Sequence, residues 1–146
     1  MEDIKYVFDV KKDDFVRAGE TSSKVKKILR ELGIDSSIIR KISIAAYEAE
    51  MNIVIHSTGG QIVLEITPGV IRITANDRGP GIADVELAMK EGYSTATDRV
   101  REMGFGAGMG LPNMKRCSDR LYVTSSEGTG TLIVIEVDLK AGEQGE

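Results

Sequence analysis

Two pairs of neighbouring β-branched runs constrain the fold of this chain more than any other feature of its sequence. Residues 61–67 and 70–75 are rich in isoleucine, valine and threonine and are joined by a Pro-Gly pair, which predicts a tight antiparallel hairpin. Residues 121–124 and 131–139 predict a second hairpin across a turn rich in serine and glycine. Residues 4–10 alternate well enough to form an edge strand.

Amphipathic helices are expected beside these strands. Residues 15–32 carry spaced apolar side chains and end at Gly33, which tolerates a left-handed backbone and so terminates helices. Ser36 or Ser37 then offers an N-cap for a second helix. Shorter helices are expected at residues 84–89 and 111–119. The second helix has one apolar stripe, formed by Ile38, Ile39, Ile42, Ala45, Ala46, Ala49 and Ile53.

Adjacent antiparallel strands beside clustered helices are typical of an α+β fold. We therefore expect a two-layer α/β sandwich in which a mixed, mostly antiparallel sheet is covered on one face by helices. The 146 residues fit one domain, 1–146. The segment at about residues 83–105 includes a stretch with little apolar periodicity and is expected to form a mobile lid, the alternative being a surface loop without a role. Residues 140–146 are expected to form a frayed tail.

Composition narrows the function classes. No apolar run approaches the roughly 20 residues of a membrane span, and the N-terminus lacks a signal-peptide pattern, so we expect a cytoplasmic protein without a membrane partner. The formal net charge of -4 gives no general attraction to nucleic acid. Cys117 and His56 are the single cysteine and histidine, which argues against an internal disulfide and a cysteine-rich or histidine-rich metal site. Any anionic ligand must therefore be held by local geometry.

Two glycine clusters indicate a nucleotide site. Asp77 follows the strand predicted at residues 70–75, where a carboxylate can accept a hydrogen bond from a ligand; the alternative is an aspartate that only begins a turn. Gly79 and Gly81 would let the backbone approach a flat base. Every second residue of 104–110 is glycine, and backbone N–H groups of such a loop before a helix can bind phosphate oxygens. The cluster lacks the Lys-Ser/Thr pair of a P-loop, so alone it does not identify the chemistry.

Glu48 and Asn52 lie four residues apart and therefore share one face of the second helix, at the edge of its apolar stripe. Taken alone, the pair is typical of a solvated glutamate beside a locally hydrogen-bonded asparagine. In combination with the two glycine clusters, the pair instead indicates a site for phosphoryl transfer.

These motifs, in their order and spacing, resemble the N box and the glycine boxes of the superfamily that contains gyrase, the Hsp90 chaperones, histidine kinases and MutL (GHKL). The resemblance spans roughly residues 35–137 and implies a Bergerat-type ATP-binding fold. Within the superfamily the chain resembles the small anti-sigma-factor serine/threonine kinases, closest to the switch kinases of the bacterial stressosome. The matching motifs are Glu48-x-x-x-Asn52, Asp77-x-Gly79-x-Gly81-Ile82, Gly106-x-Gly108-x-Gly110-Leu111 and Gly128-Thr129-Gly130-Thr131.

The resemblance implies a role for each matched residue. Asn52 would bind Mg²⁺, and Glu48 would be the general base that takes the proton from a serine or threonine hydroxyl. Asp77 would accept a hydrogen bond from the adenine amino group, with Thr131 supporting it from the neighbouring strand and Gly81 lying against the base. The residues expected to contact the nucleotide are Asn52, Asp77, Gly79, Gly81, Ile82, Gly104, Gly106, Gly108, Gly110, Leu111 and Thr131.

Two residues depart from the common pattern of the family and bear on the shape of the base pocket. Ile53 stands where a small residue is usual, and Arg78 stands where an uncharged polar residue is usual. His56 matches a histidine that is frequent in the family and is expected to be structural. Arg99 and Arg101 lie in the expected lid, where each would either neutralise phosphate charge or face solvent.

The resemblance therefore implies an ATP- and Mg²⁺-dependent serine/threonine protein kinase. Its expected substrate is a STAS-domain protein, either an anti-sigma antagonist or a stressosome scaffold, and a PP2C-type phosphatase or a sigma factor is a possible further partner. The main alternative is a nucleotide-gated module that sequesters or activates its partner without phosphorylating it. A fragment of a larger ATPase is a third interpretation. A histidine kinase is disfavoured because the sole histidine, His56, falls inside the nucleotide motifs.

Overall fold

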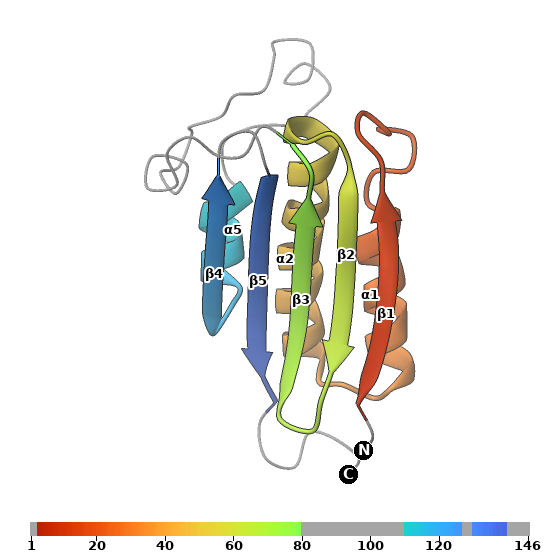
Figure 1. Cartoon of the computed structure of the whole chain (residues 1–146). Helices are drawn as coiled ribbons and strands as arrows, with labels where there is room; N and C mark the ends of the chain where they lie inside the picture. Colours follow the sequence, from red (N-terminus) through yellow and green to blue (C-terminus); the bar gives the residue numbers. More distant parts are fainter. Residues whose placement is uncertain (1–2, 80–109, 127–129, 140–146) are drawn as a thin grey trace.

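The structure is a computed structural model that describes residues 3–79, 110–126 and 130–139. Five strands and three helices make up this part of the chain (Figure 1). The strands are β1 (Ile4–Val10), β2 (Gly60–Ile66), β3 (Val70–Asp77), β4 (Arg120–Ser126) and β5 (Gly130–Asp138). The helices are α1 (Glu20–Glu31), α2 (Ser36–His56) and α5 (Gly110–Arg116).

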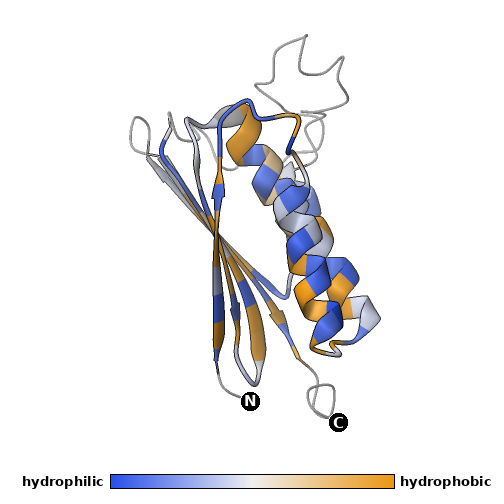
Figure 2. Cartoon of the chain, turned by 90° about the vertical axis from the view of Figure 1, so that its right-hand side faces the viewer, coloured by the Kyte–Doolittle hydropathy of each residue, from blue (hydrophilic) through white to orange (hydrophobic). Residues whose placement is uncertain are grey.

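The strands form one sheet in the order β1-β2-β3-β5-β4, and each described pairing is antiparallel. The sheet is therefore antiparallel throughout the described strands, where a mixed sheet was expected. The three described helices lie against one face of the sheet (Figures 1 and 2). The predicted two-layer α+β sandwich is confirmed, and so is the position of β1 at an edge.

The core lies between the sheet and α2. On β3, alternate side chains face the helices, so that Ile71 and Ile73 are fully buried. The predicted apolar stripe of α2 meets them, with Ile42 and Ile53 fully buried as well. Burying one such side chain stabilises a fold by about 1.5–3 kcal/mol, so this contact between helix and sheet fixes α2 firmly in place.

The ends of several elements differ from the predictions. Helix α1 begins at Glu20 and not at residue 15, and α5 ends at Arg116 and not at residue 119. Asp35, and not Ser36 or Ser37, is the N-cap of α2, because its Oδ2 accepts a hydrogen bond from the Ser37 N–H at 3.0 Å. Strand β3 runs on to Asp77, which makes this residue the end of the strand.

The helix predicted at 84–89, the lid and the tail lie outside the described residues. The single domain 1–146 stays a prediction. None of the described helices is long and apolar enough to span a membrane.

Candidate nucleotide site

Asp77 is a buried carboxylate at the last position of β3. It is 8% exposed, and its Oδ1 accepts a hydrogen bond from the backbone N–H of Thr131 on β5 at 3.0 Å. The Thr131 hydroxyl is 3.0 Å from the Ser125 hydroxyl on β4, so three strands contribute to this corner. Burial raises the pKa of Asp77, and the hydrogen bond from Thr131 opposes that rise. The structure thus places Thr131 beside Asp77, as the sequence predicted.

Glycines crowd the backbone around Asp77. A Cβ atom added to Gly60, which pairs with Asp77 across β2 and β3, would lie 2.8 Å from the Asp77 Cα. Gly130 has a φ of +129°, and a Cβ there would lie 2.1 Å from the Asp77 carbonyl oxygen. A Cβ on Gly79 would lie 3.0 Å from the Ser57 Cα. A side chain would therefore not fit at Gly60 or at Gly130. Gly60, which follows Gly59 directly, supports the site and was not predicted from the sequence.

The turn after α2 is bonded to the backbone that follows Asp77. The Ser57 hydroxyl donates to the Ile53 carbonyl at 2.8 Å and accepts from the Gly59 N–H at 3.0 Å. The Thr58 N–H donates to the Arg78 carbonyl at 2.8 Å, and the Arg78 N–H donates to the Gly59 carbonyl at 3.0 Å. These bonds hold the C-terminal end of α2 against the end of β3 (Figure 1). The helix that carries Glu48 is therefore fixed relative to Asp77.

The structure places both residues that depart from the family pattern. Ile53 is fully buried and packs in the core. Arg78 is exposed, and its Nη2 would lie 3.5 Å from a Cβ added to Gly59, so its side chain extends along the turn. The side chain of His56 is outside the description, so its structural role stays a prediction.

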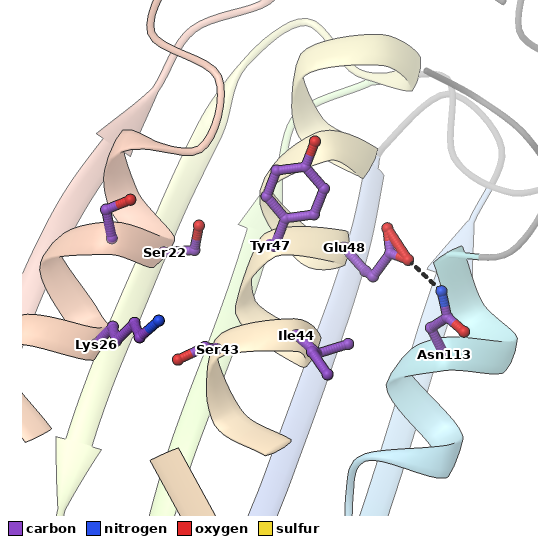
Figure 3. A pocket seen from close by; sticks show the side chains of 8 residues that line it. Ser22, Lys26, Ser43, Ile44, Tyr47, Glu48 and Asn113 are labelled. Carbon is purple, nitrogen blue, oxygen red and sulfur yellow. Dashed lines mark hydrogen bonds between the residues drawn. The ribbon is translucent and has the colours of Figure 1, made fainter. Parts of the chain in front are cut away.

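Glu48 and Asn52 are both half-buried on α2, one helical turn apart. The Asn113 side chain on α5 donates from Nδ2 to Glu48 Oε2 at 2.6 Å (Figure 3). Asn113 Oδ1 in turn accepts from Arg116 Nη2 at 2.5 Å. Asn113 was not predicted as a site residue, although its position in the first turn of the helix after the glycine cluster could have indicated it.

Glu48 lies at the edge of an open groove of about 430 Å³ on the outer side of the helices (Figure 3). Tyr47 and Ile44 contribute exposed apolar surface to it, and Lys26 contributes a positive charge. The half-buried Glu48 side chain keeps part of its surface open to this groove. Its lining residues are Ser22, Ser23, Lys26, Ser43, Ile44, Tyr47, Glu48 and Asn113.

Helix α5 begins at Gly110, the last glycine of the second cluster. A Cβ on Gly110 would meet nothing within 4 Å. Leu111 is 6% exposed and belongs to the core, so a nucleotide contact from it would have to come from its backbone. The remaining predicted contacts, Gly81, Ile82, Gly104, Gly106 and Gly108, lie outside the described residues, as do Arg99 and Arg101.

Asn52 is the residue expected to bind Mg²⁺. Among the described residues, no three histidine, cysteine, aspartate or glutamate side chains gather to hold a metal ion. Mg²⁺ usually keeps several waters and binds through few protein oxygens together with substrate phosphates. The half-buried amide of Asn52, on the same face of α2 as Glu48, can supply one such oxygen.

A second carboxylate on α2, Glu50, is 2% exposed and was not singled out from the sequence. Its two oxygens accept backbone N–H groups of Gly19 at 3.1 Å, Thr21 at 3.3 Å and Ser22 at 3.1 Å. These N–H groups stand at the start of α1, where the backbone donors have no acceptor within the helix itself. Burial raises the pKa of Glu50, and the three N–H groups oppose that rise. Its signal in the sequence was a charge on the apolar stripe of a helix.

The fold and the site together define an α+β domain with a carboxylate and an amide on α2, and with a buried aspartate at the end of β3, to which the turn after α2 is bonded. Residues 37–141 match the model of the histidine kinase-, DNA gyrase B- and HSP90-like ATPase family. The chain belongs to this family, which confirms the resemblance drawn from the motifs and implies ATP as the nucleotide.

Two relatives place the chain more narrowly, and a solved structure shares its fold. It is 33% identical over 112 residues to the serine/threonine-protein kinase RsbT of Bacillus subtilis, covering 74% of this chain and 78% of that protein. It is 37% identical over 101 residues to the anti-sigma F factor of Pasteuria penetrans, covering 64% of each. The fold matches the RsbU and RsbW domains of Rv1364c from Mycobacterium tuberculosis with a TM-score of 0.61 at 19% identity, over 95% of this chain and 34% of that one.

Proposed function

We propose that this chain is an ATP- and Mg²⁺-dependent serine/threonine protein kinase that phosphorylates a STAS-domain regulatory protein in the cytoplasm of a bacterium. The observation that carries the proposal is the position of Glu48, a half-buried carboxylate held by Asn113 at the edge of an open groove. A general base must lie within hydrogen-bond reach of the hydroxyl it deprotonates. The groove gives a serine or threonine of a second protein a route to that carboxylate.

The proposed mechanism uses two carboxylates for two tasks. Asp77 accepts a hydrogen bond from the adenine amino group, and the backbone of the second glycine cluster holds the triphosphate. Asn52 would hold Mg²⁺, which would neutralise phosphate charge. Glu48 takes the proton of the acceptor hydroxyl. The hydroxyl oxygen forms a bond to the γ-phosphorus, and the bond from that phosphorus to the β–γ bridging oxygen breaks. The products are the phosphoprotein and ADP.

A second candidate function is binding without catalysis, and the similarity to anti-sigma F factors supports a sigma factor as the partner. In this alternative the chain is a nucleotide-gated module that binds a sigma factor or a PP2C-type phosphatase without significant phosphoryl transfer. The two functions differ in whether a covalent bond forms, so one assay separates them.

The assay incubates the chain with ATP labelled on the γ-phosphate, Mg²⁺ and a STAS-domain protein from the same bacterium. Kinase function predicts label on one serine or threonine of the STAS protein, identified by mass spectrometry, and loss of labelling when EDTA removes Mg²⁺. Substitution of the labelled residue by alanine is the matched control. Stable, ATP-dependent complexes without label would instead support the binding module and contradict the kinase.

A further inference from the structure

Asn113 bridges two helices with a fixed orientation of its amide. Its Nδ2 donates to Glu48 on α2 at 2.6 Å, and its Oδ1 accepts from Arg116 on α5 at 2.5 Å. The reverse orientation would place an oxygen against a carboxylate and an NH₂ group against a guanidinium, and both contacts would be lost. The local charges therefore select the orientation in which Asn113 presents a donor to Glu48.

The start of α5 is anchored independently of this bond. Leu111, Pro112 and Met114 are buried, and α5 packs against α2. Asn113 itself is half-buried and lies on the side of α5 that lines the groove (Figure 3). Apolar burial thus holds α5 in place, and the bond from Arg116 orients the Asn113 amide.

A glutamate on a helix surface has several rotatable bonds and many rotamers. One hydrogen bond from a donor on an anchored helix removes much of this freedom. We propose that Asn113 is a positioning residue that holds the Glu48 carboxylate in the direction required for proton abstraction. The proposal rests on the proposed function, in which Glu48 is the general base.

Positioning makes a specific kinetic prediction. Misplacing a catalytic group by about 1 Å can cost about a hundredfold in rate. Asn113→Ala is expected to lower the single-turnover rate of phosphoryl transfer about tenfold to a hundredfold, at saturating ATP and STAS protein, with an unchanged affinity for ATP. Asn113→Asp, which has nearly the same shape and presents an acceptor in place of the donor, is expected to lose at least as much. Lys115→Arg, which keeps the charge at an exposed position of the same helix, is the matched control.

A double-mutant cycle tests whether Asn113 acts through Glu48. In a Glu48→Gln background, Asn113→Ala is expected to cause no further loss, because the carboxylate that Asn113 positions is already gone. Additive losses, or an Asn113→Asp protein that transfers phosphate at the wild-type rate, would overturn the positioning role. If Asn113→Ala does not fold, Asn113→Asp carries the comparison. A Glu48→Gln protein with the wild-type rate would instead contradict the proposed function itself.

Discussion

Asp77 is a buried carboxyl group, and one of its oxygens is committed within the fold. Its Oδ1 accepts the Thr131 N–H, while Oδ2 has no donor among the residues that the structure describes. Burial of the charged form raises the pKa of Asp77, which means that the ionised carboxylate lowers the stability of the fold. A ligand that donates to Oδ2 would offset this loss.

The substitution Asp77→Asn separates the ligand from the fold. The asparagine Oδ1 can still accept the Thr131 N–H, but its NH₂ group would face the adenine amino group, donor against donor. Leaving such a pair unmatched costs about 1–3 kcal/mol, so the affinity for ATP is expected to fall roughly tenfold or more, as measured by titration calorimetry. The free energy of unfolding of the nucleotide-free protein is expected not to fall. Unchanged ATP affinity would refute the assignment of Asp77 to adenine.

The start of helix α1 is set by a contact with Glu50, a residue far along the chain. Its N-cap, Gly19, makes no side-chain capping bond, and Glu50 from α2 accepts the N–H groups of Gly19, Thr21 and Ser22 instead. Local sequence rules predicted a start at residue 15 because they cannot include an acceptor about 30 residues away. The edge strand, the hairpins and the stripe of α2 depend on local patterns, and these were predicted correctly.

The candidate site likewise contains residues that were predicted from the sequence and residues that were not. Asp77 and Thr131 were predicted together because the spacing of the family motifs implies their strand positions. Asn113 and Gly60 were missed because their roles arise from contacts between elements. The Asn113 side chain donates to Glu48 on α2, and the Gly60 backbone lies against Asp77.

The burial of Glu50 predicts a pH dependence of stability. Because its pKa is raised in the fold, the folded state holds the proton more tightly than the unfolded chain. The stabilisation associated with that proton is full below the unfolded glutamate pKa of about 4.3 and is lost as the pH rises through the folded pKa. In urea unfolding, the stability of the wild type relative to Glu50→Gln should therefore decrease as the pH rises above that unfolded value. A difference that is constant with pH would contradict this.

The contact between β5 and β3 leaves no room for a side chain at Gly130. Gly130→Ala would place a Cβ 2.1 Å from the Asp77 carbonyl oxygen in a left-handed backbone conformation. We expect a loss of stability of more than about 2 kcal/mol and weaker ATP binding, measured by urea unfolding and calorimetry. Gly69→Ala is the control, because a Cβ there meets nothing within 4 Å and no change is expected. Equal effects of the two variants would contradict the role of Gly130.

At the scale of the whole molecule, charge is distributed unevenly. The chain has a formal net charge of -4, yet the exposed outer side of its helices is rich in lysine and arginine. The groove beside Glu48 opens on this side and includes Lys26. The exposed cations are Lys24, Lys26, Lys27, Arg30, Arg40, Lys41, Lys115 and Arg116.

This distribution predicts electrostatic steering of an acidic protein substrate. The association rate with the STAS protein is expected to fall at least about tenfold as the salt concentration rises from about 0.05 to 0.5 M, because the Debye length shrinks. Lys26→Glu should lower the association rate at low salt. Stopped-flow measurements that show a rate independent of salt would contradict the prediction.

Paired measurements on Glu48→Gln test the proposed kinase most directly, because they separate binding from chemistry in one protein. The affinity for ATP is expected to stay at the wild-type value, since the proposal assigns nucleotide binding to Asp77 and the glycine backbone and not to Glu48. The single-turnover rate of transfer to the STAS protein is expected to fall by at least about a hundredfold, while Glu31→Gln, an exposed carboxylate on α1, leaves both quantities unchanged. Transfer by Glu48→Gln at the wild-type rate would contradict the assignment of Glu48 as the general base.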